Sequence, residues 1–325
     1  MATEDSSPTT ATAMPYLPGQ CQSIQEDHLR NRSLAALPRT DSIPMTLPRA
    51  TNSDSDDVDR SLLAVYAPDL VELSGRVLRS QLLASSKKFM DGLNAIRVPQ
   101  TVQRNLIPMT FTIPVQFYPS DRDTPPAMYP THILAVSPTP VSSRQTPADT
   151  PVALTAVHGM IIAANCTRLA LPPPAMQPSD PRFVSLATHC MAVCSIPAFV
   201  ILRLYMYSRR IDSFMDAMMP FPPAFLETLK PQKRCPGHEG LKLNAARQSV
   251  QQTRYLADHL ILCTPGGPYP MWERIRMLQG IWQTMCDLGM YEQLLWQALD
   301  LAWQVARYAF CVVSEQHGKA LAAGR

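Results

Sequence analysis

The longest apolar run of the chain extends from Phe183 to Leu202, and its twenty residues include no charged side chain unless His189 is protonated. About 20 apolar residues are enough to cross a bilayer. However, Pro197 and several hydroxyl-bearing residues interrupt the run, and aromatic residues do not flank both of its ends. The pattern therefore predicts a central buried helix that is apolar on all sides because other helices surround it. A membrane anchor over residues 183–202 is the alternative.

Helical spacing of apolar residues predicts most of the other elements. The stretches Asp69–Ala95, Val152–Cys166 and Leu241–Leu262 are each expected to be helical. Two amphipathic helices should close the chain, one with an apolar stripe from Ile275 to Leu288 and the other with a stripe from Tyr291 to Val312. Because the junction between them is short, these two helices should fold back on each other as a helical hairpin.

One part of the chain follows a period of two residues instead. Between Met109 and Phe117, apolar residues alternate with Thr, Pro and Gln, which predicts a strand with one buried face. Pro114 cannot donate a backbone hydrogen bond and therefore indicates an edge strand. The segment His132–Val136 is its expected partner. The predicted fold class is mainly α, with a multi-helix body, a small β-hairpin element and a disordered N-terminal tail.

The N-terminal part differs from the rest in composition. Residues 1–60 are rich in Ser, Thr and Pro and contain nine acidic and five basic residues. Such a segment buries too little apolar surface to offset its chain entropy, so we predict a disordered acidic tail. Three further parts are expected: a helix and β-hairpin region at 61–136, a Pro-rich linker at 137–151 and a helical domain at 152–325.

Eight cysteines are scattered without a repeated spacing through a chain that shows no N-terminal signal peptide. They are expected to be reduced and buried, and the protein to be intracellular, in either the cytoplasm or the nucleus. The residues that come nearest to a zinc site are Cys190, Cys194, Cys235 and His238. They lack the Cys-x2-Cys spacing typical of such sites, so neither a metal nor a cofactor is predicted.

The sequence contains no nucleophile elbow, Walker loop, dinucleotide-binding loop or HExxH motif. A catalytic residue therefore cannot be named. The sequence favours a non-enzymatic protein, with an enzyme that lacks linear motifs as an alternative.

Basic residues outnumber acidic ones between positions 203 and 247, and aromatic residues lie among them. This combination is typical of grooves for single-stranded nucleic acid, where cations meet phosphates and rings stack on bases. A solvated surface with inward-facing aromatic rings is the alternative. The candidate nucleic-acid contacts are Arg203, Arg209, Arg210, Lys230, Lys233, Arg234, Lys242 and Arg247.

The two C-terminal amphipathic helices also suggest a protein interface, because the chain is rich in Met and all four Trp residues lie near its end. The candidate interface residues are Trp282, Leu294, Leu301, Val305 and Tyr308. The favoured function is a non-enzymatic assembly or interaction protein that forms homo-oligomers, as a coat or nucleocapsid-type subunit does, and contacts nucleic acid. A regulatory protein-docking factor, such as a transcriptional regulator, is the first alternative, followed by a membrane-associated protein.

Overall fold

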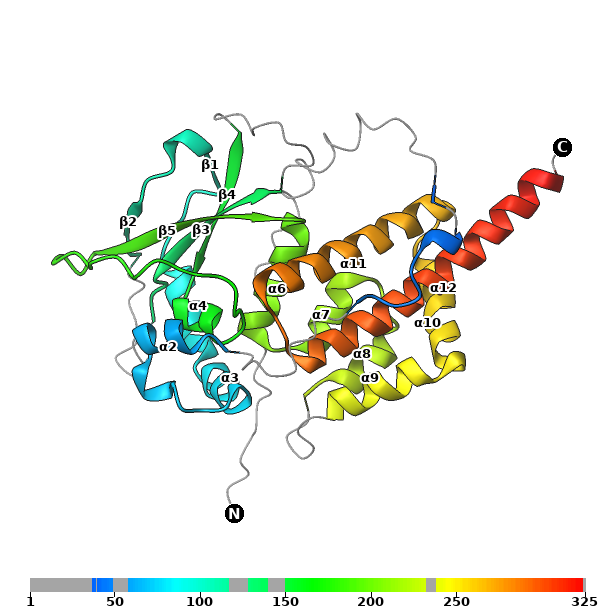
Figure 1. Ribbon diagram of the computed structural model, residues 1–325, viewed down its shortest axis with the longest axis horizontal. Helices are drawn as coiled ribbons and strands as arrows, with labels where there is room; N and C mark the ends of the chain where they lie inside the picture. Colours follow the sequence, from blue (N-terminus) through cyan, green and yellow to red (C-terminus); the bar gives the residue numbers. More distant parts are fainter. Residues whose placement is uncertain are drawn as a thin grey trace, which may run out of the picture. The chain divides into compact units, whose positions relative to one another are not determined.

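The computed structural model describes residues 37–38, 40–48, 58–116, 128–139, 150–231 and 238–323. The chain divides after Leu37, and residues 38–325 form one compact unit. This unit is mainly helical and contains one five-stranded sheet, which is larger than the predicted hairpin (Figure 1).

The sheet has the strand order β1-β4-β3-β5-β2. All neighbouring strands run antiparallel except β3 and β5, which are parallel. The strands are β1 (Thr101–Gln103), β2 (Thr110–Pro114), β3 (His132–Pro138), β4 (Pro151–Val157) and β5 (Phe183–Val193). The predicted strand β2 is confirmed, with Pro114 on an edge of the sheet, but its partner is β5 and not the predicted segment at β3.

The prediction of one central helix over 183–202 is wrong, because this run contains both a strand and the start of a helix. Strand β5 lies between β3 and β2, and strands covered on both faces contain nearly continuous apolar runs. Helix α6 (Ile196–Ser208) begins after Ser195, whose hydroxyl accepts a hydrogen bond from the Ala198 amide at 3.3 Å. Pro197 stands in the first turn of α6, where its missing N–H costs nothing.

The predicted helix at 152–166 is divided in the same way, into β4 and the short helix α5 (Gly159–Ala163). The predicted Pro-rich linker joins β3 to β4, two neighbouring strands of one sheet, so it does not separate domains. Most of that linker lies outside the described residues. Among the helices that the structure does describe, none combines the length and the apolar character that crossing a bilayer requires.

Four helical elements lie between residues 60 and 94, and the last three of them replace the predicted long helix over 69–95. Helix α2 begins after Asp59, whose carboxylate accepts a hydrogen bond from the Leu62 amide at 2.9 Å. Ser85, with φ −97° and ψ 6°, separates the helix that ends at Ala84 from the helix that begins at Ser86. The four elements are α2 (Arg60–Tyr66), the 3-10 helix η2 (Pro68–Leu70), α3 (Gly75–Ala84) and α4 (Ser86–Asn94).

Six helices follow α6: α7 (Ile211–Met218), α8 (Pro223–Leu229), α9 (His238–Gln248), α10 (Val250–Cys263), α11 (Pro268–Leu288) and α12 (Gln293–Ala323). The predicted helical hairpin is confirmed, because α11 and α12 pack against each other. Gly289 ends α11 with φ 69°, a left-handed conformation that glycine adopts without strain. A Cβ at this position would lie 2.4 Å from the hydroxyl oxygen of Thr167, so the close approach also requires glycine.

The sheet is covered on both faces. In β3, Leu134 and Val136 belong to the large core that contains the helices, whereas Ile133 and Ala135 face a second, smaller core. The segment that leads into β1, and the edge strand β2, also contribute apolar residues to this second core, such as Ile96 and Ile113. Helix α6 connects the sheet to the helices by packing against α11.

Part of the predicted disordered tail is ordered. Residues 40–48, which begin with the 3-10 helix η1 (Thr40–Ser42), bury the side chains of Ile43 and Leu47 in the large core. At the end of the predicted tail, Val58 is buried and Asp59 caps α2. The rest of the predicted tail lies outside the described residues.

Candidate functional site

Most of the predicted nucleic-acid contacts that the structure describes are neutralised by carboxylates of the same chain. Burial lowers the pKa of the Arg203 guanidinium. Among the described candidates, Lys242 alone is exposed and forms no ion pair with a described residue. Lys233 and Arg234 lie outside the described residues. The ion pairs join Arg209 to Glu292, Arg210 to Asp212, Lys230 to Glu227 and Arg247 to Asp300. Four of the six described candidates therefore already have an acidic partner within the chain.

The predicted protein interface lies largely in the protein's own core. Leu301 and Val305 are fully buried. Trp282, Leu294 and Tyr308 are partly buried and pack against that core. These residues thus hold α11 and α12 against their neighbours within the same chain.

Of the residues nearest to a zinc site, Cys190 and Cys194 are exposed, and Cys194 donates a hydrogen bond to Gln283. Cys235 and the side chain of His238 lie outside the described residues. The described part of the chain brings together no group of three or more His, Cys, Asp or Glu side chains suited to a metal ion.

Two buried histidines hold the sheet to the helices. The Nε2 atom of His158 lies 2.8 Å from the Met128 carbonyl, which can only accept, so Nε2 carries the proton. Nδ1 therefore accepts a hydrogen bond from the Tyr207 hydroxyl at 2.9 Å, and the same hydroxyl accepts from the His158 amide at 3.0 Å. Burial lowers the pKa of His158 to about 4, so this histidine is neutral at pH 7.

His132 has an equivalent set of partners. Its Nε2 atom donates to the Pro172 carbonyl at 2.8 Å, and its Nδ1 atom accepts from the Thr131 hydroxyl at 2.8 Å. Tyr66 donates to the same Pro172 carbonyl at 3.1 Å. Burial lowers the pKa of His132, although the Pro172 hydrogen bond partly opposes this. Both histidines have all their hydrogen-bonding capacity satisfied, which indicates a structural role.

A cavity of about 430 Å³ opens on the second face of the sheet. Its floor is formed by alternate residues of three strands, among them Ala135 in β3, Val152 in β4 and Cys190 in β5. The segment between β1 and β2, which contains Arg104 and Met109, forms its wall. Alternate residues of a strand point to the same face of the sheet, so these floor residues all lie on the face of the second core.

The polar groups of this cavity come from four residues. They are Arg104, Ser137, Thr188 and Cys190. The hydroxyl oxygen of Thr188 is enclosed and has no hydrogen-bond partner within the described part of the chain. Arg104 is exposed and forms no ion pair with any described residue. The cavity is thus lined mainly by apolar residues and by one basic residue, Arg104.

An open strand edge borders the cavity. The paired residues of β2 end at Thr110, opposite Ala187, and the Thr188 amide still donates to the Met109 carbonyl at 2.9 Å. Successive residues of a strand direct their backbone groups to opposite sides, so Cys190 and Ala192 face the same way as Thr188. Both residues are exposed, and no strand of the described residues pairs with this edge of β5 beyond the end of β2.

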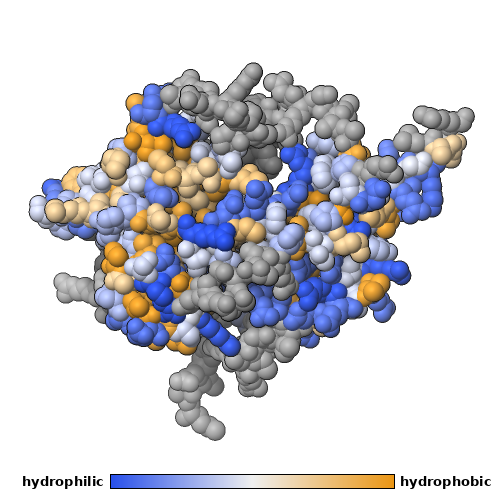
Figure 2. Space-filling model, viewed as in Figure 1, coloured by the Kyte–Doolittle hydropathy of each residue, from blue (hydrophilic) through white to orange (hydrophobic). Residues whose placement is uncertain are grey.

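Sequence reasoning did not identify this site, because Arg104 is an isolated base and the apolar run that contains β5 predicts a helix. The sequence signal that could have indicated the site is the set Thr188, Cys190 and Ala192, which occupy every second position as residues on one face of a strand do. On the face shown in Figure 2, apolar side chains are more frequent over the sheet than over α9 and α10. The exposed residue Met109 adds to this apolar character, with 86% of its surface accessible.

Comparison with protein families gives two consecutive matches, to the two domains of Clampless protein 1. Residues 53–199 match the Clampless protein 1 N-terminal domain, and residues 212–324 match the Clampless protein 1 C-terminal domain. The interval between them contains most of α6 and the bend at Arg209, which has φ 53°. The first match therefore contains the sheet and the second contains α7 to α12. The comparisons find no similar curated protein and no similar solved structure.

Proposed function

We propose that this protein is a non-enzymatic interaction protein, and that it binds an extended acidic segment of a partner along the open edge of β5. The observation that carries the proposal is the position of this edge, at Cys190 and Ala192, directly beside the cavity that contains Arg104. A regulatory docking role is thus favoured over a coat or nucleocapsid-type assembly.

The mode of binding would be addition of a strand to the sheet. An extended peptide would exchange backbone hydrogen bonds with Cys190 and Ala192, continuing the row that β2 begins. Alternate side chains of the peptide would point toward the cavity, which is lined by Arg104 and by apolar residues such as Ile107 and Met109. Backbone pairing would supply affinity, and the cavity would supply specificity.

The charge of the region favours an acidic partner. Between residues 92 and 211, the described part of the chain contains only one acidic residue, Asp180, which is paired with Arg182. Arg104 stands at the cavity without an ion pair among the described residues. A carboxylate of the partner would therefore meet a basic side chain that no described acid neutralises, an arrangement that accelerates association and selects against basic segments.

The cavity chemistry supports binding more than catalysis. Its described lining includes a thiol and two hydroxyls but no His, Asp or Glu that could act as a general base beside them. The nucleic-acid hypothesis has less support, because the predicted bases that form ion pairs within the chain are not available for phosphates. The predicted self-association surface includes Leu301 and Val305, which are buried.

The test uses the full chain and a phage library of random decapeptides, from which binders are selected and their affinity measured by fluorescence polarisation. Ala192→Pro removes a donor that faces the open edge and leaves the β3 ladder intact, so it should weaken binding by about tenfold, as loss of one hydrogen bond predicts. Ala192→Ser keeps the donor and should bind normally. Arg104→Glu should weaken binding similarly, whereas Arg97→Glu, an equal charge change outside the cavity, should not.

Selected peptides should be enriched in Asp and Glu. Peptides that bind Ala192→Pro and Arg104→Glu as tightly as the unmodified protein would refute the proposal. Thermal unfolding of each variant shows whether a loss of binding reflects a loss of folding.

A further inference from the structure

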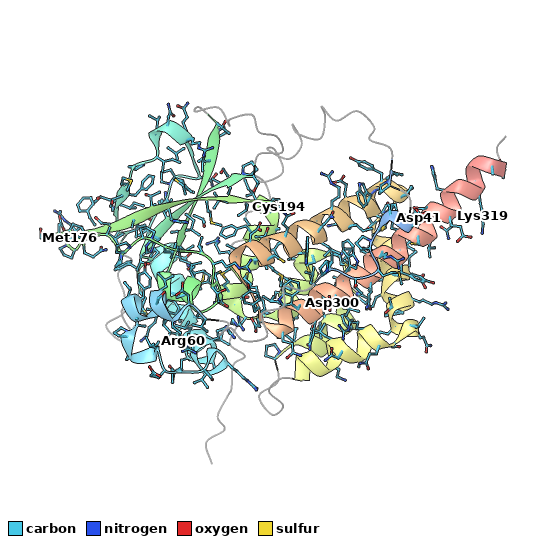
Figure 3. The ribbon with its side chains drawn as sticks, viewed as in Figure 1. Asp41, Arg60, Met176, Cys194, Asp300 and Lys319 are labelled. Atoms are coloured by element: carbon cyan, nitrogen blue, oxygen red, sulfur yellow. The ribbon has the colours of Figure 1, made fainter. Side chains whose placement is uncertain are left out.

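Residues 40–48, hereafter the arm, lie against the C-terminal helical hairpin (Figure 1). Asp41 marks the start of the arm beside α12 in Figure 3. Only two side chains of the arm are buried, Ile43 and Leu47, each with 5% of its surface accessible. The residues around them are exposed, including Met45 with 68% accessible. The arm thus binds the helices through two aliphatic anchors.

Two tryptophans bind the backbone of the arm. Trp303 of α12 donates its indole N–H to the Pro44 carbonyl at 3.1 Å. Trp282 of α11 donates to the Pro48 carbonyl at 2.6 Å. Trp303 is 1% accessible, so its indole is enclosed where the arm lies. Aromatic side chains that donate to carbonyls of a proline-containing extended segment are a general means of peptide recognition.

The anchors and the hydrogen bonds have the same spacing. Ile43-Pro44 and Leu47-Pro48 are two copies of one unit, four residues apart, and each unit provides a buried aliphatic side chain and a carbonyl for a tryptophan. The intervening residues Met45 and Thr46 are exposed. The contacts therefore define a motif, aliphatic-Pro-x-x-aliphatic-Pro, in which the positions marked x are free to vary.

The family matches include the surface to which the arm binds but not the arm itself. The matches cover residues 53–199 and 212–324, so they include α11 and α12 but not the arm. The arm is joined to α2 through residues 49–57, a stretch that can span up to about 30 Å when extended. It is therefore a tethered ligand outside the family domains, placed on a surface that belongs to one of them.

We propose that the α11–α12 surface around Trp282 and Trp303 is a docking site for an aliphatic-Pro-x-x-aliphatic-Pro segment of a partner protein, and that the arm occupies this site in cis. A short tether gives the arm an effective concentration in the millimolar range. To displace the arm, a partner segment must therefore bind with higher affinity than the arm or be present at a high local concentration. The arm thereby acts as an autoinhibitor of docking, independently of the β5 site.

The experiment compares three forms of the full chain. The double variant Ile43→Asp/Leu47→Asp should release the arm, because burial of two unpaired carboxylates is unfavourable. Met45→Asp adds a charge at an exposed position of the arm and should leave it bound. The probe is a fluorescein-labelled synthetic peptide with the sequence of residues 41–50, and binding is measured by fluorescence anisotropy.

The double variant should bind the peptide at least about tenfold more tightly than the unmodified protein and Met45→Asp, because tethered competition is lost. A peptide with Asp at both aliphatic positions should not bind. Tryptophan emission of the double variant should shift to longer wavelength as Trp303 is exposed, and the peptide should reverse the shift. Adding Trp303→Phe to the double variant should weaken peptide binding several-fold through loss of one hydrogen bond.

Equal peptide binding by all three forms, or no binding to a folded double variant, would overturn the proposal. If the double variant does not fold, Ile43→Ala/Leu47→Ala weakens the same anchors without burying charge and should show an intermediate gain in peptide affinity. Light scattering provides a further check. A concentration-dependent dimer of the unmodified protein that disappears when the arm is released would identify the arm of a second copy as the occupant, and would overturn the assignment to a partner protein.

Discussion

Neutral His158 should make folding stability depend on pH. The imidazole is enclosed between the Met128 carbonyl and the Tyr207 hydroxyl, and a second proton on Nδ1 would displace the hydrogen bond that Tyr207 donates. Because burial lowers the pKa of His158 to about 4, the unfolded chain binds a proton more readily than the folded chain. Stability should therefore fall as the pH is lowered through the unfolded value of 6.5, and this loss should level off below about pH 4.

The magnitude follows from the two pKa values. At pH 5 an unfolded imidazole with a pKa of 6.5 is almost completely protonated, whereas one with a pKa of about 4 remains mostly neutral. The difference in proton binding corresponds to a loss of about 2 kcal/mol between pH 8 and pH 5. This loss is a substantial part of the total free energy of unfolding, which is roughly 5–15 kcal/mol for a typical protein.

The assay is urea unfolding at pH 8 and pH 5 for the unmodified protein and for His158→Gln, which cannot titrate in this range. The variant should be less stable at pH 8, because the hydrogen bonds of His158 are altered. Its loss between pH 8 and pH 5 should nevertheless be smaller by about 2 kcal/mol. The comparison cancels the contributions of other groups, including His132 and His189, whose pKa values burial also lowers. Equal losses in both proteins would refute the reasoning.

Three further results are expected. Gly289→Ala should destabilise the protein by about 1–3 kcal/mol in urea unfolding, because its φ of 69° is strained for alanine, whereas Gly318→Ala, on an open helix face, should be neutral or stabilising. Leu301→Asp should abolish cooperative unfolding measured by circular dichroism, because the side chain is fully buried; a folded variant with a changed oligomeric state would instead support the interface hypothesis. In mass-spectrometric mapping, a maleimide should modify exposed Cys190 rapidly and leave Cys166 unmodified, since burial encloses that thiol and raises its pKa; equal labelling of the two in the folded protein would contradict their placement.

The parts of the fold that could be predicted are those whose burial pattern is unambiguous. The α11–α12 hairpin has one apolar stripe on each helix, and β2 has a strict alternation that only a strand produces. Strand β5 could not be recognised, because a strand covered on both faces has the same composition as a buried helix. Pro197 suggests an interruption of the apolar run, although it marks the first turn of α6.

The candidate sites were harder to predict because they are formed by distant segments. The cavity combines Arg104 with residues of β3, β4 and β5, and its floor depends on a parallel pairing that no local pattern encodes. The basic residues between 203 and 247 were conspicuous in the sequence, but acids as distant as Glu292 and Asp300 neutralise two of them. The arm provided a local signal in its repeated aliphatic-Pro unit, which the surrounding polar residues obscured.

The arm also has a consequence for the order of events during synthesis. The ribosome makes Pro44 early, but Trp303, to which it is bonded, lies 259 residues later. At about 5–20 residues per second, the arm therefore waits roughly 13–52 s before its binding surface exists. Throughout that interval Ile43 and Leu47 are available to chaperones and other ligands. Closure of the arm should thus follow the synthesis of α12, and it would report that the chain between Pro44 and Trp303 has been made.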